Sequence, residues 1–404
     1  MVSQIILHRI SEMSHVFTKL ALFFLICGLI FIAVDEIVCQ KLVTLTQTEK
    51  ENGQKPKQLS KPDKVLYTRT QLFPNDETYP STRSLLSILE AWPPDEPDAS
   101  PVPYQEFLQI FDWNLSEHRE AAKLYRDKEL PFKLTNVPDL EAAKLKWTDE
   151  FLIQKFDIEH LDNNHVVEQS MNNHFLYYDP DRRYKIQNPG YRPPTKKLKM
   201  SFSDFRKIAQ SADETGLTAE ATHYYFLTTT APNWRPGSSG SDSTHFAKTD
   251  LQLFNADHGD TFFIFNAAAN KGIQCRFGMR GVIAEAHYDV GRNFIAMVKG
   301  SKRYILTSPQ MCPKLDIIKE QKHPSFRHSR IDWSDLNQVK QRAFENVDAI
   351  ETILREGEVL YIPSCWFHYI VSLNFSIQCN SRSGRNQDGH RQAEHAIEQC
   401  LMSK

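Results

Sequence analysis

Residues 286–306 read AHYDVGRNFIAMVKGSKRYIL, and residues 367–369, much later in the chain, read FHY. His287 and Asp289 are two residues apart, so on a β-strand their side chains would point to the same side, because side chains alternate between faces with a period of two. His368 would join them from a distant strand to complete a triad. Two imidazoles and one carboxylate can occupy one face of an octahedral metal ion and leave three positions open, which is the ligand set of non-heme Fe(II) oxygenases. The sequence therefore predicts an iron site.

The composition of the chain is that of an ordinary globular protein. Its 404 residues allow one large domain or two smaller ones, and 11% aromatic residues are enough for a sizeable core. A formal net charge of -2 offers no electrostatic attraction to nucleic acid, which is therefore not expected as a partner. Seven cysteines without short paired spacings predict neither a zinc site nor a disulfide framework. They are Cys27, Cys39, Cys275, Cys312, Cys365, Cys379 and Cys400.

An uncharged run, LALFFLICGLIFIAV at residues 20–34, lies near the N-terminus. It is shorter than the roughly 20 residues of a spanning helix, but it becomes long enough if apolar neighbours sit at the interfaces and Lys19 snorkels. We predict a signal-anchor over residues 20–39 after a short tail of residues 1–19, with a cleaved signal peptide and a buried core helix as alternatives. The Lys and Arg residues flanking the run barely discriminate the orientation. We expect a single-pass membrane protein with a luminal catalytic part in the endoplasmic reticulum or Golgi, or a soluble luminal or secreted form after cleavage.

A stem is predicted over residues 40–103, before a globular domain over residues 104–404. Residues 44–64 contain no aromatic and almost no apolar residue, which is typical of a flexible tether. Residues 93–103 contain five prolines and resemble a second linker. Beyond it, Asn114 begins a tripeptide that fits N-glycosylation, which matters only if the domain is luminal.

Between residues 224 and 380 the sequence changes to short apolar or alternating runs separated by Gly and Asn. Lys299-Gly300-Ser301-Lys302 is a hairpin signal between two of them. The pattern predicts a mainly β fold with flanking helices, a jelly-roll barrel over about residues 220–385. The predicted strands are residues 224–227, 261–265, 294–298, 303–306, 350–354, 359–362 and 375–379. The helix-like segments are residues 104–111, 117–126, 332–344 and, closing the chain, 387–401.

Two segments resemble the signature blocks of the JmjC, or cupin-like, 2-oxoglutarate oxygenases. They are residues 286–306, given above, and residues 357–373, GEVLYIPSCWFHYIVSL. The resemblance is densest over residues 277–380 and is closest to the branch that contains the asparaginyl hydroxylase of hypoxia-inducible factor. It implies a double-stranded β-helix in which the triad holds Fe(II), with 2-oxoglutarate as cosubstrate and O₂ as oxidant.

The same resemblance implies a pocket for 2-oxoglutarate. Lys302 matches the cation that pairs with the distal carboxylate, and a long lysine stem can reach into a barrel. Asn293 and Asn380 match polar positions that line the pocket, and Tyr225 matches a tyrosine whose hydroxyl contacts the same carboxylate. Ala284 departs from the pattern, since the nearest relatives carry a Thr that hydrogen-bonds 2-oxoglutarate, and the lost bond would remove about 1 kcal/mol of binding.

The resemblance implies a dioxygenase that hydroxylates a protein side chain, so a protein or peptide substrate is expected. N-methyl-lysine demethylation stays open, because hydroxylation of an N-methyl group releases formaldehyde. A non-catalytic binding module with the same barrel is a rival reading, although it would not need the triad together with Lys302. An RNA-modifying enzyme is a third possible function. The chain has no excess of basic residues, which counts against it.

Overall fold

The computed structural model describes residues 79–159, 165–179, 192–230, 245–384 and 392–402. The chain divides into two units, Met1–Leu66 and Tyr67–Lys404, and all the described residues belong to the second. The predicted tail and signal-anchor lie outside the described residues. Within the described ranges, no helix combines the length and the apolar character that a membrane span requires. The membrane anchor therefore stays a prediction.

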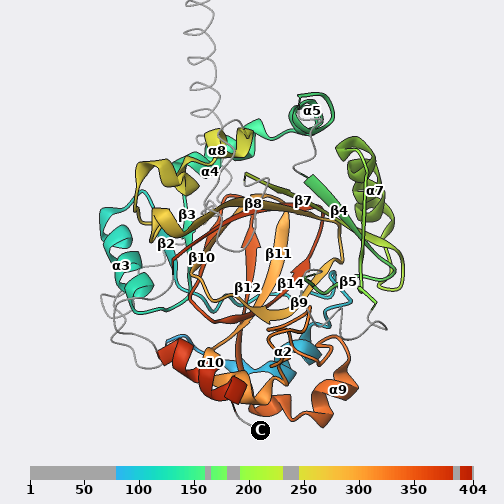
Figure 1. Cartoon of the computed structure of the whole chain (residues 1–404), viewed down its shortest axis with the longest axis vertical. Coiled ribbons are helices and arrows are strands. Elements are labelled where there is room, and N and C mark those ends of the chain that lie inside the picture. Colours follow the sequence, from blue (N-terminus) through green and yellow to red (C-terminus); the bar gives the residue numbers. More distant parts are fainter. Residues whose placement is uncertain (1–78, 160–164, 180–191, 231–244, 385–391, 403–404) are drawn as a thin grey trace, which may run out of the picture. The chain divides into compact units, whose positions relative to one another are not determined.

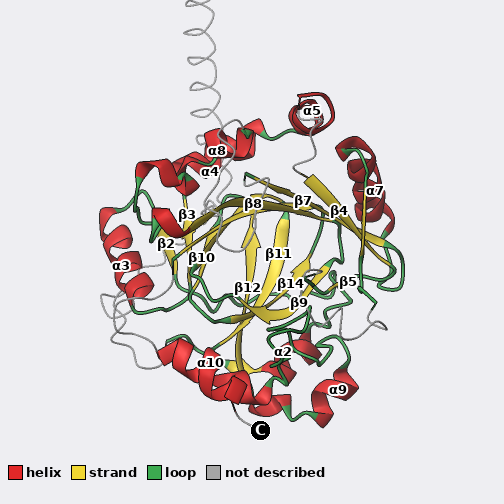
Figure 2. Cartoon of the chain, in the orientation of Figure 1, coloured by secondary structure: helices red, strands yellow, loops and turns green. Residues whose placement is uncertain are grey.

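Two β-sheets form the centre of the second unit, with helices outside them (Figures 1 and 2). The six-stranded sheet contains, in spatial order, β1 (Arg83–Ser84), β12 (Asp348–Arg355), β11 (Ser301–Thr307), β14 (Phe367–Ser372), β9 (Ile283–Tyr288) and β5 (His174–Phe175). The nine-stranded sheet contains β2 (Ile110–Asp112), β3 (Phe132–Thr135), β13 (Val359–Ile362), β10 (Asn293–Lys299), β15 (Ser376–Ser383), β8 (Asn270–Gly278), β7 (His223–Thr229), β4 (His165–Ser170) and β6 (Lys196–Leu198). Eight of these strands, β8 to β15, supply four neighbours to each sheet. This is the predicted double-stranded β-helix.

The turn between β10 and β11 crosses from one sheet to the other. β10 pairs with β13 and β15, whereas β11 pairs with β12 and β14, so the hairpin predicted at residues 299–302 is wrong. Gly300 makes the crossing possible with a φ of 68°. A side chain there would meet the carbonyl oxygen of Phe375, because an added Cβ would lie 2.2 Å from it.

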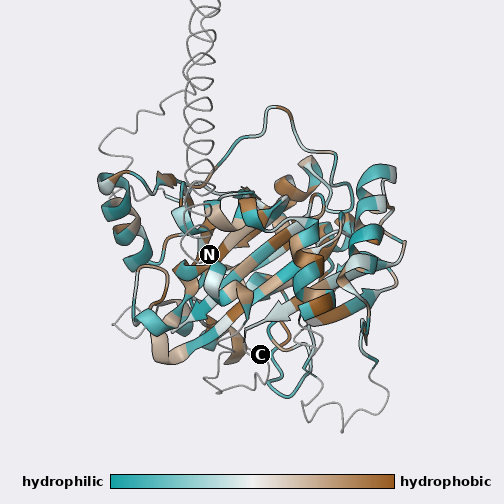
Figure 3. Cartoon of the chain, turned by 90° about the horizontal axis from the view of Figure 1, so that it is seen from above, coloured by the Kyte–Doolittle hydropathy of each residue, from teal (hydrophilic) through white to brown (hydrophobic). Residues whose placement is uncertain are grey.

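The space between the sheets is filled by side chains that alternate along the strands, as a period of two requires. On β11, Tyr304 and Leu306 point into the barrel, whereas Arg303 and Ile305 point outward. The inner cluster consists of Leu108, Ile295, Met297, Tyr304, Leu306, Ile350, Leu354, Leu360, Ile362, Trp366 and Ile370. Figure 3 shows that hydrophobic and hydrophilic residues are mixed along single strands.

Helices cover the outer face of each sheet (Figure 2). In α7 (Phe202–Thr215), Phe202 packs on Phe277 of β8 and Phe205 on Phe226 of β7. Three helices pack on the six-stranded sheet: α2 (Leu85–Ala91), α9 (Leu336–Gln341) and α10 (Gln392–Met402). The remaining α-helices are α3 (Ser116–Asp127), α4 (Pro138–Lys146), α5 (Asp149–Ile153) and α8 (Phe246–Asp250).

The folded part begins before the boundary predicted at Tyr104. Leu85, Ile88 and Leu89 of α2 are fully buried against the six-stranded sheet. Trp92 is buried as well, with the guanidinium of Arg303 lying 4.3 Å from its ring centroid. The predicted stem therefore differs from the structure over residues 79–103, because tertiary packing decides the state of a segment whose composition resembles a linker.

Two smaller predictions of secondary structure are also wrong. Residues 104–111 form no helix, since the carboxylate of Glu106 accepts hydrogen bonds from the backbone N–H groups of Phe107 and Leu108 and pairs with buried Lys133. Residues 261–265 form a turn instead of a strand, with the N–H of Thr261 donating to the carbonyl of Ile264. In the predicted helix at residues 332–344 only α9 is helical, and the predicted C-terminal helix is α10.

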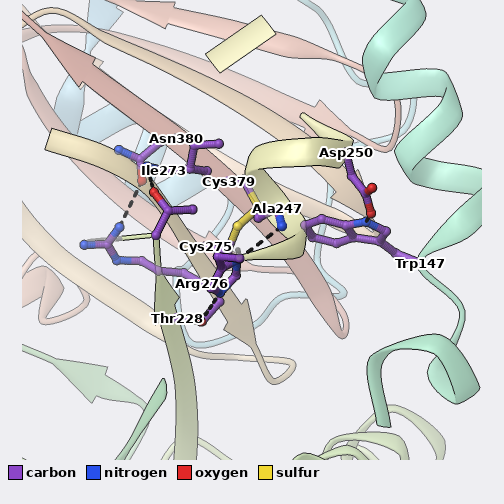
Figure 4. The surroundings of a disulfide bond; sticks show 11 residues. Trp147, Thr228, Ala247, Asp250, Ile273, Cys275, Arg276, Cys379 and Asn380 are labelled. Carbon is purple, nitrogen blue, oxygen red and sulfur yellow. Dashed lines mark hydrogen bonds between the residues drawn. A yellow bond between two sulfur atoms is a disulfide. The ribbon is translucent and has the colours of Figure 1, made fainter. Parts of the chain in front are cut away.

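Two disulfides, Cys275–Cys379 and Cys312–Cys400, contradict the prediction that the cysteines form no disulfide framework. Cys275 and Cys379 lie directly opposite each other on β8 and β15 (Figure 4). Cys312, in the 3-10 helix η5 (Pro309–Lys314), ties α10 to the outside of the six-stranded sheet through Cys400. The bonded residues are 104 and 88 positions apart, so short-spacing rules could not find them.

Candidate metal centre

A β-bulge on β9 places His287 inside the barrel. His368 of β14 pairs with His287, but Ile370 pairs with Ala284. The two pairs are therefore three residues apart on β9 and two residues apart on β14. The extra residue lies between Ala284 and His287, and both of these face the interior although their separation is odd. Without the bulge, strict alternation would turn His287 to the outer face of the sheet.

The structure brings His287, Asp289 and His368 together, with ligand atoms within 4.8 Å of one another. The two imidazole centroids are 4.2 Å apart. The Nδ1 of His287 is 2.7 Å from the carbonyl oxygen of Glu285, and that of His368 is 3.1 Å from the carbonyl oxygen of Trp366. A carbonyl oxygen can only accept, so each Nδ1 carries the hydrogen and each Nε2 keeps a free lone pair. This tautomer is the one that a metal ion requires.

The electrostatics of the triad also suit a metal ion. Burial, with the neighbouring His368, lowers the pKa of His287 to about 3, and burial lowers the pKa of His368 as well. Burial would raise the pKa of Asp289, but the charges of Arg382 and the two imidazoles hold it well below its usual range. At neutral pH both imidazoles are therefore neutral and the carboxylate is ionised, which are the protonation states of metal ligands.

The sequence did not point to two residues beside the triad. Arg382 of β15 donates from Nη1 to Asp289 Oδ1 at 2.8 Å and from Nη2 to Gln274 Oε1 at 2.8 Å. It lies two residues after Asn380, so the period of two could have indicated it. His328 is buried and stacks on His287 with ring centroids 4.9 Å apart. It comes from the long segment between β11 and β12, which carries no local signal.

The four residues predicted to bind 2-oxoglutarate also face the barrel interior. Lys302 is fully buried, and its Nζ donates to the Tyr225 hydroxyl at 3.2 Å. Asn380 donates from Nδ2 to Asn293 Oδ1 at 3.0 Å. Arg276, which the sequence did not indicate, donates from Nη1 to Asn380 Oδ1 at 3.0 Å (Figure 4). Lys302 and Arg276 therefore place two cationic side chains among the predicted 2-oxoglutarate-binding residues, in addition to Arg382 beside the triad.

Lys302 differs from the other buried cations of the barrel. Lys133 pairs with two carboxylates, and Arg303 pairs with Glu351. Among the described residues, no carboxylate pairs with Lys302. Burial, and then the charge of Arg276, lower its pKa well below the ordinary value. A buried ammonium without a counter-ion is costly, and an anionic ligand would compensate it.

The distance along β14 between the levels of Lys302 and the triad is comparable to the length of such a ligand. Leu306 pairs with His368 and Lys302 with Ser372, so Lys302 stands four residues from the level of the triad, roughly 13 Å at the usual rise per residue. Gly278 lets the Lys302 ammonium and Ser372 pack close to its backbone, since an added Cβ would lie 2.3 Å from Ser372 Oγ and 3.3 Å from Lys302 Nζ. A lysine stem and a five-carbon dicarboxylate together fit this interval.

Comparison with known proteins bears on this arrangement. The profile of the family described as "Cupin-like domain" matches residues 118–381, well over half of the chain. The chain belongs to the cupin-like domain family. The match runs from α3 to β15 and contains the triad and all the predicted pocket residues.

Relatives of known name match shorter stretches. JmjC domain-containing protein D of Dictyostelium discoideum is 34% identical over 28% of this chain and 25% of its own length. The tRNA wybutosine-synthesizing protein 5 of Mus musculus is 30% identical over 44% of this chain and 53% of its own. The Lysine-specific demethylase JMJ30 of Arabidopsis thaliana is 30% identical over 26% of this chain and 24% of its own length. The chain thus spans a quarter to about half of the length of these relatives. These relatives support the assignment of the chain to the JmjC-type oxygenases. Its placement in the branch of the asparaginyl hydroxylase stays a prediction.

Proposed function

We propose that the protein is an Fe(II)- and 2-oxoglutarate-dependent dioxygenase. The observation that carries the proposal is the presence, in one barrel, of a triad with two free Nε2 atoms and of buried Lys302 without a carboxylate partner, on the neighbouring strand β11 and roughly 13 Å from the level of His368. The donor set fits a non-heme iron, and the ammonium fits the far carboxylate of 2-oxoglutarate. A binding module without catalysis would have no physical need for both.

When bound, Fe(II) with 2-oxoglutarate and O₂ would supply the oxidising chemistry, placing one oxygen atom on a substrate C–H bond while 2-oxoglutarate becomes succinate and CO₂. His287, Asp289 and His368 would hold the iron. Arg382 orients the Asp289 carboxylate, and Lys302 with Tyr225 would hold the distal carboxylate of the cosubstrate.

Apolar side chains of the inner cluster lie beside the triad. Leu306 and Ile370 line the barrel beside the level of His368, and Ala284 packs against the same cluster. Such a lining excludes water from the neighbourhood of the metal, which strengthens the charge interactions inside the pocket.

For the substrate we propose a protein side chain, with N-methyl-lysine demethylation as the alternative. The names of the relatives refer to tRNA wybutosine synthesis and to lysine demethylation, and a net charge of -2 does not favour RNA. Disulfides persist in oxidising compartments, so the two bonds found here support the proposed luminal location together with the uncharged run at residues 20–34. A luminal enzyme would meet secretory proteins and would not meet histones or tRNA.

Succinate release tests the reaction. The full chain is incubated with Fe(II), 2-oxoglutarate and O₂, with separate pools of secretory peptides, methyl-lysine peptides and RNA. We expect turnover with the first pool and its loss in Asp289→Ala, while Asp127→Ala, which removes an exposed carboxylate at the end of α3, keeps it. Turnover that survives Asp289→Ala contradicts the proposed triad, and binding of Fe(II) and 2-oxoglutarate without turnover on any pool favours the binding module.

A glycosidase assay tests the location separately. Asn114 is exposed in the turn that follows β2, so the glycosylation enzymes could reach it in the lumen. We expect a glycosidase to reduce the mass of protein isolated from cells and Asn114→Gln to abolish the shift. An unmodified Asn114 in otherwise glycosylation-competent cells counts against the luminal location.

A further inference from the structure

A second group of metal-ligating side chains lies on the outer face of β9, outside the barrel. His174 of β5, Glu285 of β9 and Asp332 have ligand atoms within 4.8 Å of one another. His174 Nδ1 contacts Glu285 Oε1, and its Nε2 lies 4.0 Å from both Asp332 Oδ2 and Asp95 Oδ1. We call His174, Glu285 and Asp332 the outer cluster. The bulge that turns His287 inward is the same feature that leaves Glu285 on this side.

The outer cluster, together with the neighbouring Asp95, carries an excess of negative charge. Three carboxylates, those of Asp95, Glu285 and Asp332, surround the one imidazole of His174. In the part of the chain that the structure describes, no Lys or Arg forms an ion pair with any of them. The Glu285 side chain is only 14% exposed, so solvent screens it poorly. A cation would balance this charge.

Tyr369 provides an independent observation. Its hydroxyl is buried and has no hydrogen-bond partner among the described residues. Its neighbours on β14, His368 and Ile370, pair with His287 and Ala284, so Tyr369 lies opposite the bulge of β9 that contains Glu285 and packs on the outer face of the sheet. Trp333 stacks on the ring at 5.3 Å and holds it there. A buried hydroxyl without a partner costs free energy, and water on a hydrated cation would satisfy it.

We propose that His174, Glu285 and Asp332 bind a divalent cation, with Asp95 and Tyr369 next to it. One imidazole nitrogen with carboxylate oxygens suits Zn²⁺, a borderline ion, or the harder Mn²⁺, and Zn²⁺ binds more tightly to most such sites. Binding replaces the direct contact between His174 and Glu285 with two bonds to the ion. The cation joins β5, β9 and the segment that carries Asp332.

This outer site would support the triad through one residue. Glu285 contributes its side chain to the outer cluster, and its carbonyl oxygen accepts the hydrogen bond from His287 Nδ1. An ion that fixes Glu285 therefore also fixes the orientation of an imidazole inside the barrel. Glu285 is a positioning residue in this arrangement.

Zinc binding to a chain without the barrel site tests the proposal. In the full chain, Asp289→Ala with His368→Ala removes two of the three triad ligands, so the result does not depend on the proposed oxygenase function. After removal of metal by a chelator, Zn²⁺ alone is titrated by calorimetry. We expect one ion per chain at micromolar affinity or better, and at least a tenfold loss on adding either Asp332→Asn or His174→Gln.

Glu320→Gln is the matched control, because this exposed carboxylate of the same segment is already paired with Arg330 and should not affect the affinity. Thermal unfolding of each variant provides a second readout, since Zn²⁺ should raise the melting temperature only while the outer cluster is intact. A background protein that binds no Zn²⁺, or one whose affinity and melting shift survive both substitutions, overturns the proposal.

Discussion

Arg382 and Asp289 form a direct ion pair at 2.8 Å between β15 and the end of β9, and this pair links the two sheets beside the triad. The guanidinium keeps the carboxylate ionised and limits its rotation, so only a small reorganisation is needed before a metal ion binds. Partners of this kind contribute to metal affinity although they do not touch the ion.

Arg382→Gln should therefore weaken Fe(II) binding about 10- to 100-fold, the usual range for residues that orient metal ligands. Anaerobic titration of the metal-free protein with Fe(II) measures the change. Arg330→Gln is the control, because this partly exposed arginine pairs with Asp316 and Glu320, away from the barrel interior. An unchanged Fe(II) affinity in Arg382→Gln would mean that the ion pair does not organise the ligand.

Lys302→Met should weaken 2-oxoglutarate binding by about 10- to 100-fold, since a hydrogen bond to a charged group contributes roughly 1.5–3 kcal/mol. The affinity is measured by calorimetry with Mn²⁺ in place of iron, which avoids turnover. Lys299→Met at the end of β10 is the matched control, and the 2-oxoglutarate affinity should not change there. Equal affinities of the two variants would place the distal carboxylate elsewhere, with Arg276 as the next candidate.

Ala284→Thr should strengthen 2-oxoglutarate binding about fivefold, which corresponds to about 1 kcal/mol for one added hydrogen bond. Ala284 lies opposite Ile370 and packs against the inner cluster, so a slightly larger side chain must displace apolar neighbours only. Ala284→Val adds a similar volume without a hydroxyl and should bring no gain. If both variants bind 2-oxoglutarate equally, the hydroxyl does not reach the cosubstrate.

The stability of the metal-free protein should fall as the pH falls below about 6.5. Burial lowers the pKa of both His287 and His328 to about 3, so between these pH values the unfolded chain binds protons that the folded chain does not. Each group would cost up to about 1.4 kcal/mol per pH unit. Urea unfolding at pH 7, 6 and 5 measures the slope. His328→Phe keeps an aromatic ring stacked on His287 and should reduce the slope of the unfolding free energy with pH. An unchanged slope would mean that His328 is already protonated in the folded protein.

Cys400→Ser should lower the free energy of unfolding by roughly 3–5 kcal/mol, because the bond to Cys312 closes a loop across 88 residues of sequence. Urea unfolding under oxidising conditions measures the loss. Adding a reductant should bring the wild type toward the variant. A count of reactive thiols in denatured, unreduced protein that leaves Cys312 and Cys400 free would contradict the bond.

The barrel strands could be predicted from the sequence because each of them carries its own signal. Residues 294–298, 303–306 and 359–362 are apolar, β-branched or aromatic runs, and they lie within β10, β11 and β13. The triad could be proposed because a His-x-Asp pair and a distant His can be read directly from the sequence. No sequence pattern indicated the bulge that turns His287 into the barrel. The expected alternation of side chains describes His287 and Asp289, which follow the bulge, but it does not hold across the bulge itself.

Features that depend on strand pairing could not be predicted. The turn at residues 299–302 has the same sequence whether its strands pair with each other or enter opposite sheets. Arg276 and Arg382 face the pocket only because β8 and β15 are neighbours in a particular register, and the disulfide pairs depend on the same information. No local sequence pattern contains the order and register of the strands.

The disulfide between Cys275 and Cys379 has one more consequence. Arg276 and Asn380 are the next residues on the same two strands, on the opposite face (Figure 4). A slip of β15 along β8 by one residue would turn Asn380 and Arg382 away from the interior, since every side chain would change face. The covalent bond forbids this slip. Once oxidised, the cysteine pair therefore holds β8 and β15 in the one register that turns Arg276, Asn380 and Arg382 inward.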